Sequence, residues 1–171
     1  MLGLLGLMLG LTGAAQALDA VKGPAMVEVV FFEPEKFTDV RDGYMGTDKG
    51  RDSTLAMLKE YLISRAAREL AAGQKLAITV NDVDLAGDFE PWRSPQWNDV
   101  RIVKDIYPPR VVLAFRLTDA EGKVIKEGVR DLRDMAFMMK LTMGFRDDTL
   151  RHEKALLDDW LSAEFKAAKK G

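Results

Sequence analysis

The sequence contains no cysteine and a single histidine, His152. These absences exclude disulfide bonds, thiolate metal sites and a zinc site built from several histidines. Charge of one sign is not in excess either, because 25 lysine and arginine residues stand against 27 aspartate and glutamate residues. No basic field over the whole chain favours nucleic acid as a partner. The carboxylates are therefore the best lead for any catalytic chemistry.

The first 17 residues contain no charged residue and are mostly leucine, glycine and methionine. They end in Ala15-Gln16-Ala17, the small-x-small pattern that signal peptidase reads, so we predict an export signal cleaved after Ala17. No lysine or arginine follows Met1, and a start codon placed too far downstream would explain this difference from an ordinary signal. The alternative is an uncleaved membrane anchor, since about 17 apolar residues is the lower limit for a span.

The remaining chain has the size of one domain. Residues 18–26 read as a linker, 27–166 as a single domain and 167–171 as a basic tail. Runs of alternating or β-branched residues predict strands, and apolar residues at three-to-four spacing predict helices. The strands are expected at 27–33, 75–80, 100–106, 110–117 and 123–130, and the helices at 52–72, 130–139 and 149–166. We therefore predict an α+β fold, a mostly antiparallel sheet of four to five strands with two main helices packed on one face.

The strand that begins at Lys75 changes its pattern near its end. Leu76, Ile78 and Val80 alternate, but the next apolar residues are Val83 and Leu85. Because side chains alternate along a strand, this change of parity predicts a strand end or a β-bulge, and bulges often lie near functional sites.

Three carboxylates, Asp82, Asp84 and Asp88, follow this change of parity. Hard cations such as calcium or magnesium bind carboxylate oxygens without histidine or cysteine, so a metal-dependent hydrolase could use these residues. The other interpretation is that the aspartates cap turns and pair with Arg101 or Arg110. We favour the second interpretation and predict no catalytic residue, no metal and no cofactor.

A polar loop at 88–98 contains two prolines and two tryptophans. Exposed tryptophan is costly unless it packs or binds, so Trp92 and Trp97 either fold back over the core or serve as rigid anchors for a partner. Tryptophan and arginine are frequent anchors at interfaces, which adds Arg93 to the candidate surface.

Three other features complete the expectations. Residues 38–51, with three glycines, read as a long loop that matches neither a phosphate-binding loop nor a calcium-binding loop. The methionine-rich segment after Arg130 is expected to place Leu132, Met135 and Met139 in the core and to end at Gly144. His152 is expected at the surface or in a helix cap, and Glu153 and Lys154 in ion pairs with the sheet or with Arg130 and Arg133.

Several motifs resemble a bacterial family of uncharacterised secreted proteins that is known only as a domain of unknown function. The resemblance lies in Asp82-Val83-Asp84-Leu85-Ala86-Gly87, in Val100-Arg101 leading to Tyr107-Pro108-Pro109-Arg110, in 128–134, and in His152-Glu153-Lys154 with Trp160. It covers about Val27 to Phe165. It implies a periplasmic location in Gram-negative bacteria and transfers no activity, substrate or catalytic residue.

We therefore predict a periplasmic, non-enzymatic domain that binds an envelope protein or a small ligand. The contact surface is expected at Asp82, Asp84, Asp88, Trp92, Arg93 and Trp97, and the loop at 43–51 is a candidate to lie beside it. Nucleic acid is not expected as a partner, and membrane contact is expected only through the signal segment before cleavage. The alternative function is a carboxylate-based hydrolase that depends on a divalent metal.

Overall fold

The computed structural model describes residues 26–93, 95–140 and 148–165. The predicted signal peptide, nearly all of the linker, Gly144 and the basic tail lie outside these residues. In chain order the elements are β1 (Met26–Phe31), a 3-10 turn η1 (Pro34–Lys36), α1 (Asp48–Ala66), β2 (Lys75–Asp84), β3 (Asp88–Phe89), η2 (Pro95–Trp97), β4 (Arg101–Ile102), β5 (Arg110–Thr118), β6 (Val124–Arg133), η3 (Phe137–Met139) and α2 (Arg151–Phe165).

The main sheet has four strands in the order β1-β2-β5-β6, and β3 and β4 form a separate pair. The β1–β2 pair is parallel, while β2–β5 and β5–β6 are antiparallel. A parallel pair needs a long crossover, and α1 supplies it between β1 and β2. The predicted α+β fold with a mostly antiparallel sheet is confirmed.

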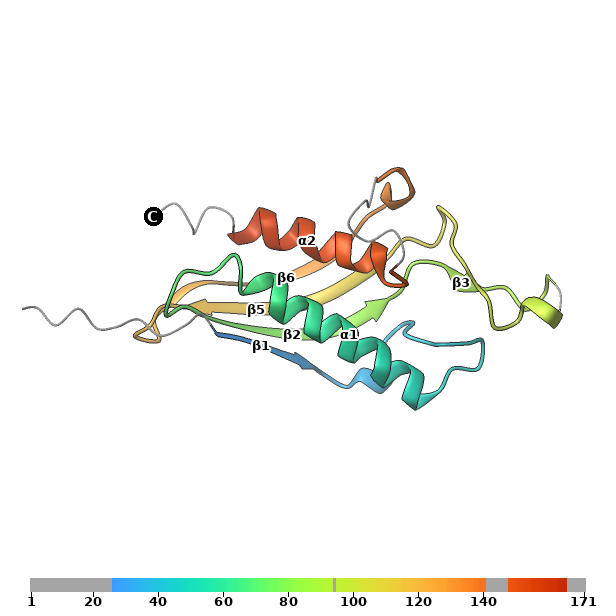
Figure 1. Cartoon of the computed structure of the whole chain (residues 1–171), viewed down its shortest axis with the longest axis horizontal. Coiled ribbons are helices and arrows are strands. Elements are labelled where there is room, and N and C mark those ends of the chain that lie inside the picture. Colours follow the sequence, from blue (N-terminus) through green and yellow to red (C-terminus); the bar gives the residue numbers. More distant parts are fainter. Residues whose placement is uncertain (1–25, 94, 141–147, 166–171) are drawn as a thin grey trace, which may run out of the picture.

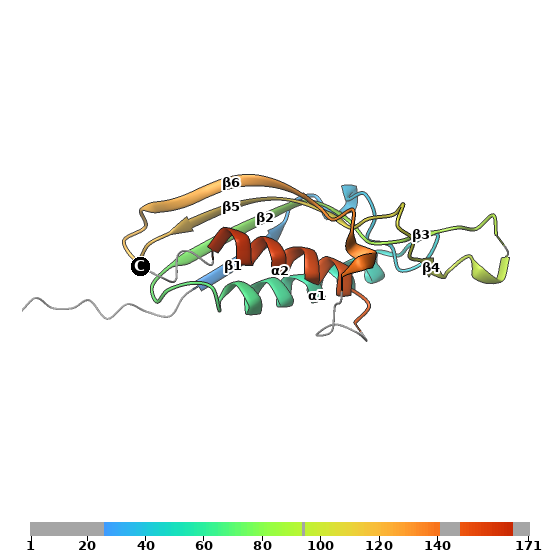
Figure 2. The ribbon, with the colours of Figure 1, turned by 90° about the horizontal axis from the view of Figure 1, so that it is seen from above.

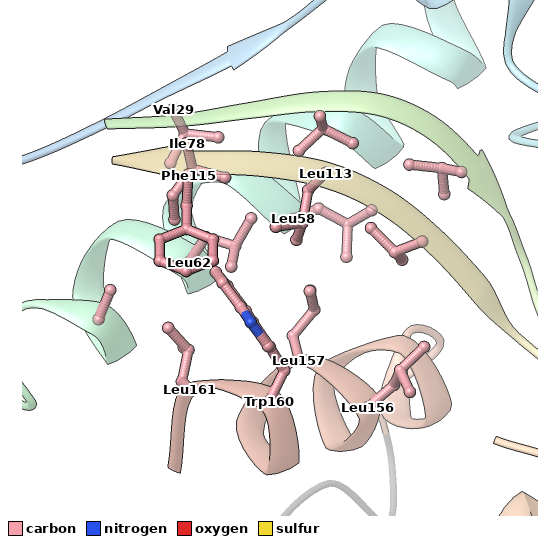
Figure 3. Close-up of a cluster of buried hydrophobic side chains, with 14 of the residues drawn as sticks. Val29, Leu58, Leu62, Ile78, Leu113, Phe115, Leu156, Leu157, Trp160 and Leu161 are labelled. Atoms are coloured by element: carbon pink, nitrogen blue, oxygen red, sulfur yellow. The ribbon is translucent and has the colours of Figure 1, made fainter. Parts of the chain in front are cut away.

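Both helices lie on the same side of the sheet, next to each other (Figures 1 and 2). Leu58 and Leu62 of α1 and Leu157 and Leu161 of α2 are buried there against the alternate residues of the strands (Figure 3). Trp160 reaches from α2 to the ring of Phe115 on β5, at 5.8 Å between ring centroids and an interplanar angle of 63°. Edge-to-face contacts of this kind add to the stabilisation from burial.

The change of parity in β2 is a β-bulge. The pairing of β2 with β5 shifts between Val80 and Asp82, so that Asn81 is the extra residue. Ile78 and Val80 before the bulge and Val83 after it are all buried. The bulge thus keeps both apolar sets on the core side and places Asp82 and Asp84 on the opposite side.

Helix α1 begins earlier than expected. Its N-cap is Thr47, whose side chain accepts a hydrogen bond from the amide of Gly50, so the predicted start at Asp52 or Ser53 is wrong by one turn. Threonine is a favourable N-cap residue, and a glycine in the first turn, here Gly50, does not prevent this cap. The helix also ends at Ala66 rather than Ala72, although the predicted apolar stripe is buried as expected.

The segment after Arg130 is not a helix. Strand β6 continues to Arg133, which pairs with Arg110 of β5, and a 3-10 turn follows. Phe137 is buried there, whereas Met135 and Met139 are exposed. The alternation of charged and apolar residues at 130–133 fits a strand as well as a helix, and the pairing with β5 decides between them.

The final helix and the hairpin before it agree better with expectation. Helix α2 buries all the apolar residues assigned to it, and the Asp148 carboxylate accepts a hydrogen bond from the amide of Leu150 at its start. The β5–β6 turn has Gly122 at φ 85°. The strand expected at 100–106 is shorter, because only Arg101–Ile102 pairs with a neighbour.

Candidate functional site

A narrow extension leaves the body of the molecule between β2 and β5. We call it the tryptophan ribbon, residues 88–93 and 95–102. Its strands β3 and β4 pair at two positions, Asp88 with Ile102 and Phe89 with Arg101. In both views it projects beyond the ends of the main sheet and helices (Figures 1 and 2).

Gly87 turns the chain from β2 into the ribbon. Its φ is 84°, and a Cβ at this position would lie 2.8 Å from the carbonyl oxygen of Ile102. Its amide donates to the carbonyl oxygen of Tyr107 at 3.0 Å. A side chain would therefore meet both backbone strain and a steric clash, so the turn requires glycine.

The base of the ribbon is fixed by a buried carboxylate. The Arg101 guanidinium donates to both oxygens of Asp39, at 2.9 and 3.1 Å, and also donates to the carbonyl oxygen of Gly87. Arg41 Nε donates to Asp39 at 3.0 Å, and its Nη2 donates to Asp88 at 3.1 Å. Bidentate pairs of this kind hold both partners in a fixed orientation.

An aromatic ring completes this anchor. Phe89 of β3 is buried, and the guanidinium groups of Arg41 and Arg101 lie 5.4 and 4.6 Å from its ring centroid. Burial alone would raise the pKa of Asp39, but the hydrogen bonds from Arg101 and Arg41 outweigh it and hold that pKa below its ordinary value. Asp39 is therefore ionised at neutral pH and holds the base of the ribbon against the end of β2.

A second carboxylate, Glu90, organises the middle of the ribbon. The ammonium group of Lys104 and the hydroxyl of Tyr107 both donate to its Oε1, the latter at 3.1 Å. Arg93 Nε lies 3.1 Å from its Oε2. The hydrogen bond from Lys104 is the main reason that the pKa of Glu90 is lowered. Two cations thus surround one buried carboxylate, which leaves this group of charges net positive.

The far end of the ribbon exposes its aromatic side chains. Trp92 is 71% exposed and Trp97 is 50% exposed. A shallow apolar hollow of about 370 Å³ lies beside Trp97, lined by Arg93, Trp97, Val100 and Ile102. The tryptophans do not fold back over the core, so of the two interpretations the exposed anchor agrees with the geometry.

The three predicted aspartates do not converge on one point. Asp82 accepts from the amide and hydroxyl of Thr38, at 2.7 and 2.8 Å, and from Arg110 at 2.9 Å. Asp88 accepts from Arg41. Among the described residues, no group of three or more histidine, cysteine or carboxylate side chains could hold a metal ion. Pairing with Arg110 agrees with one interpretation of the sequence, whereas Arg101 pairs with Asp39 instead.

Asp84 differs from its neighbours. It lies in a cleft of about 350 Å³ between the body and the base of the ribbon, with Asp88, Tyr107 and Arg133 on the same walls. Burial, followed by the negative charges of Asp39 and Asp82, raises its pKa. Asp84 therefore adds a carboxyl group with a raised pKa to the cleft at the base of the ribbon. It lies 8 positions before the exposed Trp92 in the sequence.

Two expectations for α2 are wrong. His152 is buried and meets the ring of Phe137 edge-on at 4.8 Å, and burial together with Arg151 lowers its pKa, so it is neutral. Glu153 forms no ion pair with the sheet. It is buried and accepts a hydrogen bond from the amide of Ala86 at 2.6 Å, and burial raises its pKa. The carboxyl group thus ties the start of α2 to the turn that leads into the ribbon.

No sequence pattern predicts the Asp39–Arg101 contact, because the two residues are 62 positions apart. The available signal was local: an aspartate two positions before Arg41 is a common arrangement in turns.

Among the described helices, none is long and apolar enough to cross a membrane.

Fold and site together define an α+β domain with a braced, projecting ribbon that exposes two tryptophans. The chain belongs to the family described as "Protein of unknown function (DUF3016)", whose model matches residues 25–163. The predicted resemblance to a family of unknown function is thereby confirmed. Comparison with curated proteins and with solved structures found no match.

Proposed function

We propose that this chain is an exported, non-enzymatic interaction domain of the bacterial envelope, and that the tryptophan ribbon is its contact surface. The observation that carries this proposal is the combination of a braced base and an exposed aromatic end. Asp39 and Arg101 brace the base, while Trp92 and Trp97 remain open to solvent.

This arrangement is favourable for binding for two reasons. Burying a large apolar side chain contributes about 1.5–3 kcal/mol, and the exposed tryptophans have not yet gained this stabilisation. Binding also costs free energy when flexible groups become ordered. The contacts of Asp39, Phe89 and Glu90 have already ordered the ribbon, so less of the gain from tryptophan burial is lost.

The alternative, a metal-dependent hydrolase at Asp82, Asp84 and Asp88, would require a different arrangement. Asp82 would have to leave Arg110 and Thr38, and Asp88 would have to leave Arg41, before either could serve as a ligand. The geometry therefore favours the interaction surface over the hydrolase.

Photo-cross-linking in cells that produce the protein tests the proposal. A diazirine amino acid is placed at position 92 or 97 and, as matched controls, at Phe32 on the continuation of β1 or at Val129 on β6, which are 57% and 67% exposed. After irradiation, the mass of each adduct shows whether it contains a polypeptide, a lipid or a small molecule. We expect adducts from positions 92 and 97 at several times the yield of the controls.

Equal yields at all four positions would contradict the proposal, because collisions alone would then account for the adducts. The absence of an adduct at positions 92 and 97 would contradict it as well. Localisation is tested separately by fusing residues 1–25 to a reporter enzyme that is active only outside the cytoplasm, and activity of the fusion is expected.

A further inference from the structure

The end of the ribbon has an unusual composition for an exposed loop. Residues 91–98 contain two tryptophans, two prolines and one charged residue, Arg93, with no carboxylate. The structure exposes Trp92, Arg93 and Trp97 together. This composition differs from that of the rest of the chain, in which acidic and basic residues are nearly balanced.

We propose that this end of the ribbon inserts into the headgroup region of an anionic phospholipid bilayer. The proposal rests on the ribbon being the contact surface and names its partner. It goes beyond the expectation that membrane contact is made only through the signal segment.

Tryptophan suits this location for a physical reason. Its ring is apolar and its indole N–H is polar, so the side chain is favoured where the acyl chains meet the headgroups. The segment between β3 and β4 forms the end of the projection (Figure 1), and its Trp92 and Trp97 are exposed, so both can enter a flat surface while the body of the molecule stays outside. The two prolines in the same stretch also carry no backbone N–H that would need a hydrogen-bond partner there.

The charges favour an anionic surface. Glu90 is surrounded by Arg93, Lys104 and the hydroxyl of Tyr107, so one carboxylate is shared by two cations. Lys104 lies beside the base of the ribbon, and Asp99, which follows the end, is exposed and accepts a hydrogen bond from the amide of Tyr44. Within residues 91–98 the charge is therefore that of Arg93 alone, and a basic residue near an anionic bilayer contributes about 1 kcal/mol of attraction.

The hollow beside Trp97 has matching chemistry. Its walls are three apolar side chains and one guanidinium, in a space of about 370 Å³. An anionic phospholipid offers the same pair of features, an acyl chain next to a phosphate. Arginine can place its apolar stem along the hydrocarbon and its guanidinium at the phosphate.

The test uses the full chain and vesicles whose acyl chains carry bromine, which quenches tryptophan fluorescence at contact. The chain has three tryptophans, and Trp160 is buried in the core, so quenching reports on the ribbon. Residues 1–25 contain no tryptophan, so quenching requires that the tryptophans of the ribbon themselves reach the acyl chains. We expect quenching and a blue shift with vesicles of phosphatidylglycerol, and weaker quenching with phosphatidylcholine alone or at high salt.

Matched variants separate the contributions. Trp92→Ala with Trp97→Ala is expected to lower vesicle affinity by roughly tenfold or more, and the remaining Trp160 emission should not be quenched. Arg93→Glu is expected to keep quenching on phosphatidylcholine but to lose the preference for phosphatidylglycerol. Phe32→Ala, an exposed aromatic residue away from the ribbon, is expected to behave as the unaltered chain.

A vesicle-bound chain without quenching would overturn the inference, because the tryptophans would then lie outside the bilayer. Absence of vesicle binding would overturn it too. If the cross-links at positions 92 and 97 nevertheless contain a polypeptide, the partner is a protein and the proposed function stands without the bilayer. If those positions give no adduct and no quenching, both proposals fail.

Discussion

Arg101 and Asp39 form a bidentate ion pair at 2.9 and 3.1 Å between the ribbon and the segment beside the end of β2. The Asp39 side chain is 7% exposed and that of Arg101 is 19% exposed. Removing one partner of a buried pair leaves the other charge uncompensated, which costs about 3–5 kcal/mol. Arg41 remains as a second partner of Asp39, so the cost here should lie at the lower end of that range.

Arg101→Gln is therefore expected to lower the free energy of unfolding by about 3 kcal/mol and to speed amide exchange in the ribbon. Urea unfolding and hydrogen exchange measure the two effects. The double variant Asp39→Asn with Arg101→Gln should recover part of the loss, because it removes the unpaired carboxylate as well. A loss below about 0.5 kcal/mol would mean that the pair does not brace the ribbon.

The Asp39–Arg101 pair also makes the stability of the folded chain depend on pH in the acid range. The pKa of Asp39 is lowered in the folded chain, so the stabilisation is fully present above the unfolded pKa of about 4 and is lost as pH falls through the folded pKa. Below about pH 4, exchange of the ribbon amides in the native chain should accelerate relative to the intrinsic exchange rate at the same pH. In Asp39→Asn that acceleration should be reduced, and an unchanged pH profile would assign it to other carboxylates.

Gly87 offers a test of the turn into the ribbon with a matched control. Gly87 and Gly122 have nearly the same φ, 84° and 85°, but a Cβ at Gly87 meets the Ile102 carbonyl oxygen, whereas one at Gly122 has nothing within 4 Å. Gly122→Ala should cost about 1 kcal/mol of stability through φ alone, and Gly87→Ala about 1–3 kcal/mol more. Equal costs in thermal or urea unfolding would contradict the close approach.

The contribution of Glu153 to stability is expected to depend on pH in the opposite direction to that of Asp39. Its folded pKa is raised by burial, so its contribution to stability declines as pH rises from the unfolded pKa through the folded one. Glu153→Gln keeps an acceptor for the Ala86 amide and removes the buried charge. It should raise the free energy of unfolding at pH 8 by about 1–3 kcal/mol and change little near pH 4.

Glu153→Leu is the control for that experiment. It removes the acceptor as well as the charge, so the amide of Ala86 is left without its partner, at a cost of about 1–3 kcal/mol. If Gln and Leu at position 153 behave alike, the hydrogen bond to Ala86 does not contribute to stability.

Periodicity predicted those parts of the fold that depend on local pattern. Alternation located β2 as far as Val80, and its change of parity left a strand end and a β-bulge as alternatives, of which the structure has the bulge at Asn81. Apolar spacing located the buried side of α2, from Leu156 to Phe165. Segment 130–133 was assigned wrongly, because its local pattern fits two structures and its pairing with β5 could not be seen in one sequence.

The candidate site was predictable only in part. Composition singled out Trp92 and Trp97, but exposure depends on whether the rest of the chain covers them. Asp82, Asp84 and Asp88 are close enough in the sequence to suggest a cluster, yet the partners of Asp82 and Asp88 come from two distant segments, residues 38–41 and Arg110. The brace from Asp39 to Arg101 joins residues 62 positions apart, and no pattern in the sequence connects them.

The central claim is that the end of the ribbon is covered by a partner in the cell. Because the chain has no cysteine, a single one introduced by Gln96→Cys at the exposed end of the ribbon is a unique label, and Val129→Cys on β6 is its control. The measurement is the rate of reaction with a membrane-impermeant maleimide in cells, divided by the rate for the purified chain. The account predicts a several-fold lower ratio at position 96 than at position 129, and equal ratios would contradict it.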